Sequence, residues 1–511
     1  MMFRLTLSGV LVLCSLIFTP DRSAMADQPY EADWTSLSKH VAPEWFKDAK
    51  FGIYTHWGPV TVGSENAEKG GVQWYGMRMY EPKNPAFDFH RETFGEQKDF
   101  GYKDIVERFT APEFDAEKWA ELFAASGAKF AGPVVIHHDN YAMWDSKVTE
   151  WDTMDKGPKR DVTAELEKAI RAQGLKFIAT FHHSFTWRYF EPSYKFDGSD
   201  PKYVNLYGDA HEADAPPTPR FLDQWLAKIN EVVVNYEPDM IWFDFGLGER
   251  NCVTPEYQQR MFADYYNWAA KHNRQVGVAH KHWDIHENTG IIDFERGRLD
   301  YLPEFPWLTD TSVGPWFNQK SVKFKTENDL VDVLVDIVSK NGCMLLNVGP
   351  TAAGEIPPEA AALLRGIGKW LEANSEAIFS TRPWLVYGEG PTQMTKSGGF
   401  SEKDGFHYTA SDIRYTRSKD GSTLYAILLD RAEGDVTLRS VQVEQAADSA
   451  TVQMLGHDGL VDYIINDSKQ LVLRLPKLGE LEFPSEHAVA FKLNGFKTSL
   501  HPRVSKQEKQ P

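Results

Sequence analysis

Residues 239–246 read Asp239-Met240-Ile241-Trp242-Phe243-Asp244-Phe245-Gly246, an apolar run that ends on an acid. Residues 221–236 before it carry apolar side chains at helical spacing, and Pro238 ends that helix. Because the run has no polar alternation, it predicts a strand buried on both faces. A parallel α/β barrel keeps its chemistry at the C-terminal ends of such strands. Asp244 is therefore a candidate nucleophile, although an Asp in this position also commonly caps the following turn.

The composition is that of an acidic protein rich in aromatic side chains. The chain has 511 residues, enough for two or three domains, and a formal net charge of −18. Because no basic stripe offsets this charge, a nucleic-acid partner is excluded. Aromatic residues make up 13% of the chain, with 16 Trp, which suits a protein that stacks rings against a ligand as well as in its core.

The first 26 residues have the pattern of a secretory signal peptide. A positive charge is followed by an apolar stretch over 5–18 that is too short to span a bilayer, and residues 24–26 offer a small-residue cleavage pattern. We therefore expect a protein that is periplasmic or secreted after cleavage near Ala26, with no membrane anchor. The mature chain would keep Cys252 and Cys343, too few for a disulfide framework.

Predicted strands and helices alternate through the first three quarters of the chain. The strands are expected near 51–55, 130–136, 175–181, 240–243, 275–279 and 343–348, and the helices near 115–126, 161–173, 221–236, 255–273, 329–340 and 358–379. This alternation predicts an α/β fold with a parallel sheet. The number of units and the lack of a phosphate-binding glycine fingerprint favour a (β/α) TIM-like barrel catalytic domain over residues 27–383.

After residue 383 the pattern changes to short strands between turn signals. These strands are expected at 422–429, 436–443, 451–455, 470–475 and 488–493. They predict a C-terminal antiparallel β-sandwich over 384–495, with a packing role or an ancillary sugar-contact role. Residues 496–511 are expected to form a flexible tail.

The predicted barrel strands end on histidines or on an acid, so one rim would gather them. They are His56, His137, His138, His182, His183, Asp244, His280 and His282. Neighbours on a strand point to opposite faces, so each adjacent histidine pair would direct one ring inward. No helix carries a His-Glu-x-x-His arrangement, and we predict neither a metal nor a cofactor. Neutral hydrogen-bonding histidines, many rings and one or two carboxylates together describe a sugar pocket.

Glycoside hydrolysis normally uses two carboxylates, and candidates for the second lie between residues 275 and 310. They are Asp284, Glu287, Asp293, Glu295, Asp300, Glu304 and Asp310. Residues 291–297 stand out, because a short apolar run ends in Glu295 beside Arg296 and Gly297. The alternative interpretation of this stretch is a surface salt bridge on a loop.

Several long motifs, spread from about Trp45 to Pro383, closely resemble the α-L-fucosidases of glycoside hydrolase family 29. They are Phe51-Gly52-Ile53-Tyr54-Thr55-His56-Trp57-Gly58-Pro59, Trp74-Tyr75, Trp119-Ala120, His137-His138-Asp139, Trp242-Phe243-Asp244, Leu345-Leu346-Asn347-Val348-Gly349-Pro350, Ile367-Gly368-Lys369-Trp370-Leu371 and Ala377-Ile378-Phe379. The resemblance implies retaining double displacement on terminal α-L-fucose, with Asp244 as nucleophile. It implies Glu295 as acid/base, with Glu287 and Glu304 in reserve. Retention in turn predicts two carboxyl groups about 5–5.5 Å apart.

The resemblance also implies which residues hold the sugar. His56, Gln73, Trp74, His137, His138, His183 and His282 would contact it, and Trp242 and Trp316 would form an apolar wall near its C6 methyl group. Gln73 stands where family members often have Glu, which replaces a carboxylate acceptor with an amide. Hydroxyl recognition in this chain would therefore differ.

Two other functions are compatible with the same residues. One is an inactive barrel that only binds sugar, and the other is a glycosidase for a related substrate such as an α-L-galactoside. A sulfated fucan would need cations near the pocket, for which Lys281, Arg296 and Arg298 are candidates. The expected partner is a fucosylated oligosaccharide or polysaccharide, while linkage, aglycone and oligomeric state are left open.

Overall fold

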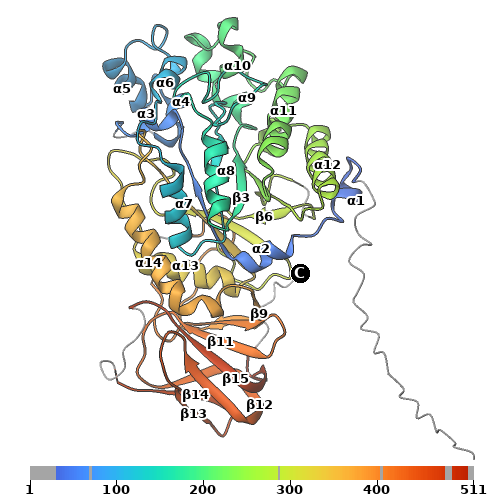
Figure 1. Ribbon diagram of the computed structural model, residues 1–511, viewed down its shortest axis with the longest axis vertical. Helices are drawn as coiled ribbons and strands as arrows, with labels where there is room; N and C mark the ends of the chain where they lie inside the picture. The colour runs from blue at the N-terminus through green and yellow to red at the C-terminus, as the bar shows by residue number, and fades with distance from the viewer. Residues whose placement is uncertain (1–29, 68–71, 286–287, 403–406, 478–485, 505–511) are drawn as a thin grey trace, which may run out of the picture.

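The structure is a computed structural model that describes residues 30–67, 72–285, 288–402, 407–477 and 486–504 (Figure 1). The predicted signal peptide over residues 1–26 and the reserve acid Glu287 lie outside these residues. Within the described chain, no helix is long and apolar enough to cross a membrane.

Eight parallel strands close into a barrel in chain order. They are β1 (Phe51–Thr55), β2 (Phe130–Ile136), β3 (Lys176–Phe181), β4 (Met240–Phe243), β5 (Gly277–Lys281), β6 (Ile291–Asp293), β7 (Trp307–Ser312) and β8 (Gly342–Val348). Strand β8 pairs with β1, with Leu346 opposite Ile53, and closes the ring. The prediction of a TIM-like barrel is confirmed.

Strands β6 and β7 were absent from the predicted set, and their composition explains why. Strand β6 has three residues, and β7 carries the polar run Thr309, Asp310 and Thr311. In the described residues, no helix separates β5 from β6 or β6 from β7. The alternation of strand and helix that identified the other strands is therefore missing at this point of the barrel.

Helices surround the strands, as Figure 1 shows. The longer ones are α7 (Ala116–Ala125), α8 (Val162–Ala172), α11 (Pro219–Tyr236), α12 (Pro255–Lys271), α13 (Glu327–Ser339) and α14 (Pro358–Asn374). The shorter ones are α1 (Trp34–Leu37), α2 (Glu44–Ala49), α3 (Val60–Ser64), α4 (Tyr75–Arg78), α5 (Pro85–Thr93), α6 (Tyr102–Arg108), α9 (Thr186–Tyr189) and α10 (Val204–Tyr207). Side-chain caps begin several of them: Asp161 accepts a hydrogen bond from the backbone of Ala164 at the start of α8.

Strand β4 shows how the sequence selects the residues that face the barrel axis. Met240 and Trp242 pack in the interior cluster with Tyr54, whereas Ile241 and Phe243 pack in the core between strands and helices. Because side chains alternate along a strand, the even-numbered residues point inward. Asp244 directly follows the strand in the same inward phase, so it reaches the axis at the C-terminal end of the barrel.

The C-terminal part is an antiparallel sheet with its own core, and the prediction of an antiparallel C-terminal domain is confirmed. The strand order is β13-β14-β12-β15-β11-β10-β9. Their bounds are β9 (Thr381–Glu389), β10 (Ile413–Ser418), β11 (Thr423–Leu428), β12 (Gly434–Met454), β13 (Asp462–Ile465), β14 (Gln470–Leu475) and β15 (Val489–Leu500). Strand β15 continues past Gly495, where a tail was expected, because Phe496 and its neighbours pair with β12.

The sheet lies against α13 and α14 of the barrel domain (Figure 1). A buried charged group joins the two: Arg414 of β10 donates through Nε to Asp336 of α13 at 2.7 Å, and Lys340 donates to the same carboxylate at 2.8 Å. Since a buried carboxylate needs such partners, this contact fixes the sheet on the barrel.

Candidate active site

A cavity of about 340 Å³ opens at the C-terminal ends of the barrel strands. This is the end at which barrel enzymes hold their active sites. Its lining combines histidines, acids and aromatic rings: His56, Gln73, Trp74, His137, His138, His182, Trp242, Asp244, Phe245, Arg250, Trp283, Glu295, Asp310, Trp316, Phe317 and Phe400.

Asp244 is held between a histidine and a lysine. Its Oδ2 lies 3.3 Å from Nε2 of His138, and its Oδ1 lies 3.7 Å from Nζ of Lys281. Burial by itself would raise the pKa of Asp244, but the hydrogen bond from His138 and the charge of Lys281 outweigh burial and hold the pKa below its ordinary value. The carboxylate is therefore ionised, and its side chain keeps 13% of its surface exposed toward the cavity.

His138 also has a fixed orientation. Its Nδ1 donates to the backbone carbonyl of His182 at 2.6 Å, so Nε2 can donate to Asp244 only when both ring nitrogens carry protons. In that state the ring places a positive charge against one oxygen of the Asp244 carboxylate.

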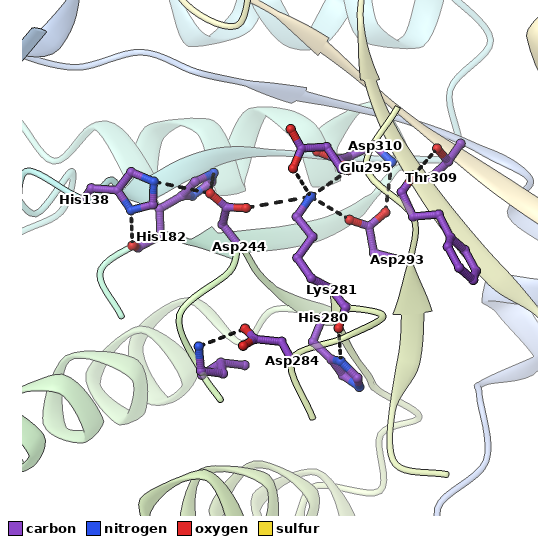
Figure 2. A network of polar contacts seen from close by, with 12 residues as sticks. His138, His182, Asp244, His280, Lys281, Asp284, Asp293, Glu295, Thr309 and Asp310 are labelled. Carbon is purple, nitrogen blue, oxygen red and sulfur yellow. Dashed lines mark hydrogen bonds and ion pairs between the residues drawn. The ribbon is translucent and has the colours of Figure 1, made fainter. Parts of the chain in front are cut away.

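Lys281 is fully buried and lies among four carboxylates, as Figure 2 shows. Its Nζ is 2.9 Å from Asp293, 2.8 Å from Asp310, 3.4 Å from Glu295 and 3.7 Å from Asp244. Burial alone would lower the pKa of Lys281, but these acids raise it well above its ordinary value. One ammonium thus faces four acids and can compensate the charge of only one carboxylate, so the cluster favours protons on some of the others.

The acids around Lys281 differ in protonation. Burial, together with the neighbouring Asp310, raises the pKa of Asp293 well above its ordinary value. Burial also raises the pKa of Glu295 to about 7, with Asp310 and Asp244 adding to the rise and Lys281 opposing it. Glu295 is 16% exposed and lines the cavity, whereas Asp293 is fully buried below it. The protonated acid that can reach a ligand is therefore Glu295.

The loop that carries Glu295 is fastened by strand β7. Thr309 donates through Oγ1 to the carbonyl of Phe294 at 2.7 Å and accepts from the backbone of Gly297 at 3.1 Å. The backbone N–H of Arg296 donates to the carbonyl of Asp310 at 2.8 Å. These bonds hold the acid in place although it comes from an irregular part of the barrel (Figure 2).

The opposite wall of the cavity is made of neutral imidazoles. Burial lowers the pKa of His56 to about 4 and the pKa values of His137 and His182 well below their ordinary range. Nδ1 of His56 donates to Asn347 at 2.9 Å, so its Nε2 accepts from Nε2 of His182 at 3.1 Å when both rings are neutral. Nδ1 of His137 and of His182 are buried without a partner among the described residues, so each is a polar atom that no described side chain satisfies.

Most of the predicted sugar-contacting residues meet in this cavity. His56, Gln73, Trp74, His137, His138, Trp242 and Trp316 line it, together with Asp244 and Glu295. Both His137 and His138 face the cavity, which corrects the expectation of one inward ring per pair. Strand β2 ends at Ile136, so the alternation of faces no longer applies to these two residues.

His183 and His282 lie outside the cavity lining, and their place in the strand pattern explains why. His183 has the outward phase of β3 and stacks on Trp225 of α11, with ring centroids 5.9 Å apart. His182, one residue earlier, lines the cavity instead. His282 has the phase of His280, which is opposite to that of Lys281, and it packs on Phe294. On β4, Met240 and Trp242 point inward. The residues paired with them on β3 and β5 also point inward, and the alternation continued from those residues places His182 and Lys281 on the inner side.

The proposed reserve acid Glu304 is exposed and is not part of the lining. The three cations considered for sulfate binding are not part of the lining either. Lys281 is enclosed by acids, Arg298 is buried and donates to the hydroxyl of Tyr408 at 3.3 Å, and Arg296 lies over the ring of Trp316 at 4.6 Å.

Three lining histidines offer the donors that a metal ion would need. His56, His137 and His182 place one ring nitrogen each within 4.8 Å of one another, and three imidazoles form a known zinc donor set. All three residues line the cavity, and their lowered pKa values keep the rings neutral, so the same rings equally suit the hydroxyl groups of a sugar.

Comparisons with known proteins show the family of the chain. The family described as "Alpha-L-fucosidase" matches residues 17–376, and the family described as "Alpha-L-fucosidase C-terminal domain" matches residues 407–494. The tissue alpha-L-fucosidase of Bos taurus is 31% identical over 96% of this chain and 98% of its own. The corresponding protein of Homo sapiens is 29% identical over 93% and 94%. The alpha-fucosidase of Thermotoga maritima, solved in complex with fucose, is 27% identical with a TM-score of 0.70, covering 91% of this chain and 100% of its own.

Proposed function

The chain belongs to the alpha-L-fucosidase family of glycoside hydrolases, and from this premise we propose that it is a retaining exo-α-L-fucosidase that removes terminal α-L-fucose from glycans or glycoconjugates. Asp244 acts as the nucleophile and Glu295 as the acid/base. The observation that carries this proposal is the pair of cavity-lining carboxyl groups with divergent pKa values, one below its ordinary range and one raised to about 7. Such divergence assigns one group to the ionised role and the other to the protonated role.

The first step forms a covalent intermediate. An oxygen of Asp244 attacks the anomeric carbon, the bond to the leaving oxygen breaks, and Glu295 transfers its proton to that oxygen. His138 and Lys281 stabilise the ionised form of Asp244 before the attack. Both carboxyl groups contact the same ammonium, at 3.7 Å and 3.4 Å, which allows the separation of about 5–5.5 Å that retaining enzymes use. That separation stays a prediction.

The second step releases the sugar. Glu295, now ionised, takes a proton from water, the water oxygen attacks the anomeric carbon, and the bond to Asp244 breaks. Two inversions give net retention. The neutral histidines would hold the sugar hydroxyls, and Trp242 and Trp316 would face the apolar C6 methyl group.

The decisive experiment follows hydrolysis of an aryl α-L-fucoside by the purified protein with NMR, beside the matched aryl α-L-galactoside. We expect α-L-fucose as the first product and much weaker activity on the galactoside, because the additional hydroxyl group would meet the tryptophan wall. If β-L-fucose appeared first, the double displacement would be wrong. If the fucoside were bound without hydrolysis, the protein would be a sugar-binding barrel.

The same proposal includes the destination of the protein. The signal pattern over residues 1–26 supports export to the periplasm or the medium. N-terminal sequencing of the protein from its native host tests this, and a mature chain that starts near Asp27 is expected.

A further inference from the structure

Two exposed aromatic rings stand at the edge of the cavity. Trp283 follows β5 and is 39% exposed, and Phe400 follows β9 and is 54% exposed. Both line the cavity, and their ring centroids are 6.5 Å apart with 25° between the planes. Side chains of this size are rarely left open to water without a binding role when they share one patch.

Phe400 is held at this place by the loop that carries the acid. Its backbone N–H donates to the carbonyl of Glu295 at 2.7 Å, and the backbone of Gly398 donates to Arg298 at 2.7 Å. Two residues further on, the Glu402 carboxylate accepts from Lys325 at 2.6 Å. The segment 398–402 therefore lies beside 295–298, with an isolated antiparallel bridge between Gly398 and Arg298, and the backbone of Phe400 is tied to that of Glu295.

The backbone of Phe400 has a positive φ of 55°. A bulky residue in this left-handed region is strained. The pairing of segments 398–402 and 295–298 holds this backbone conformation. The conformation in turn fixes the direction in which the ring leaves the backbone. The ring consequently projects into the cavity mouth beside Trp283 instead of packing into the core.

The position of the acid decides which part of a substrate these rings meet, and this step rests on the proposed function. Glu295 must touch the leaving oxygen, so the sugar that carries the fucose must leave the cavity on the Glu295 side. The two rings lie on that side. A sugar sandwiched between two aromatic rings needs about 3.5–4 Å on each face, and 6.5 Å between centroids is too short for this. The rings therefore offer one shared surface.

We propose that Trp283 and Phe400 form the subsite for the leaving sugar, a neutral pyranose ring that places its C–H face on the two aromatic rings. The C-terminal part of the chain thus contributes a substrate contact and is more than a packing partner. Trp283 and Phe400 would discriminate among glycans by the sugar to which the fucose is linked, whereas the histidine wall would bind the fucose itself.

The test separates the fucose from its leaving group. Wild type, Trp283→Ala, Phe400→Ala and the double variant are assayed on methyl α-L-fucoside, whose leaving group needs protonation but has no ring, and on a disaccharide with fucose α-linked to a neutral hexose. We expect the ratio of kcat/KM on the disaccharide to kcat/KM on the methyl fucoside to fall about 3- to 10-fold for each single variant. The conservative Trp283→Phe should restore most of the ratio.

A matched control is Phe305→Ala, because Phe305 is 42% exposed and lies outside the cavity lining. It should keep the wild-type ratio. If the activities of the Trp283 and Phe400 variants fell equally on both substrates, the rings would only support the acid loop and the subsite would be refuted. If wild type hydrolysed neither substrate, the proposed function itself would fail, which is a distinguishable outcome.

Discussion

The two ends of strand β4 carry two buried aspartates with opposite surroundings. Asp239 at the start of the strand is 2% exposed and lies 2.9 Å from Arg171, 3.0 Å from Lys176 and 2.9 Å from Arg274. Asp244 after the end of the strand borders the cavity and shares Lys281 with three other acids. At both aspartates the neighbouring cations outweigh burial and hold the pKa below its ordinary value.

The difference lies in the balance of charge. Around Asp239 three cations surround one carboxylate, so every lone pair has a partner and the group closes the bottom of the barrel. Around Lys281 four carboxylates surround one cation, so charge compensation is incomplete. The carboxylate oxygens can therefore still form hydrogen bonds with a ligand. A low pKa alone therefore does not identify a reactive acid. A low pKa in a cavity, next to a second acid whose pKa is raised, is the more specific signal.

The largest expected effect is the loss of activity in Asp244→Ala. Removing the nucleophile should lower kcat/KM on an aryl α-L-fucoside by roughly 10⁴-fold or more, because the covalent route is closed. Added azide should restore turnover and give β-L-fucosyl azide, the product of a single inversion. The matched variant is Asp239→Ala, whose folded fraction should keep kcat within a few-fold of wild type. An active Asp244→Ala would remove the functional contrast between the two ends of β4.

Glu295→Ala should have the next largest effect, and its size should depend on the leaving group. We expect kcat/KM to fall about 10²- to 10⁴-fold on a fucosyl disaccharide, which needs protonation, and clearly less on an aryl fucoside with an acidic phenol. Azide should give α-L-fucosyl azide, because it enters after the first inversion.

Asp310→Asn is the comparison for Glu295, since Asp310 lies 2.8 Å from the same ammonium and also lines the cavity. If Asp310→Asn showed the dependence on the leaving group and Glu295→Ala did not, the acid/base would be Asp310.

Asp239→Ala should affect stability instead of chemistry. Leaving three cations without their carboxylate should cost about 3–5 kcal/mol of unfolding free energy, measured by urea denaturation. Asp244→Ala should cost less or even stabilise the fold, since it removes one of the four acids that compete for Lys281. If Asp244→Ala lost more unfolding free energy than Asp239→Ala, Asp244 at the C-terminal end of β4 would also have a primarily structural role.

The same strand also shows how far the sequence predicts the structure. The apolar run 240–243, its breaker Pro238 and the acid after it are local signals, and all correspond to the observed strand. Asp244 and Glu295 were predicted to be the catalytic pair, and the structure brings both side chains to one cavity.

The parts that escaped prediction depend on contacts between distant segments. Phe400 enters the cavity through pairing with residues 295–298, more than a hundred positions away. Asp310 belongs to a strand with polar residues that lacks a preceding helix, and Lys281 has a function only through acids from three other strand ends. No periodic pattern in the sequence predicts these contacts between distant residues.

The smallest expected effect is a shift in the pH profile. It tests whether Lys281 controls the pKa values of both Asp244 and Glu295. With the proposed roles, activity needs Asp244 ionised and Glu295 protonated, so kcat/KM should fall as pH rises through about 7, the pKa of Glu295. The acid limb should lie below pH 4, because the pKa of Asp244 is lowered from 3.8.

Lys281 lowers the pKa of both groups, so Lys281→Met should move both limbs to higher pH, by about one unit or more. Asp310→Asn provides the opposite change for Glu295. Asp310 raises the pKa of Glu295, and the variant removes its charge while keeping the size of the side chain, so the alkaline limb should move to lower pH. Limbs that stayed in place in both variants would mean that Lys281 neutralises the buried acids without tuning the reactive ones, and the top of β4 would then resemble its bottom.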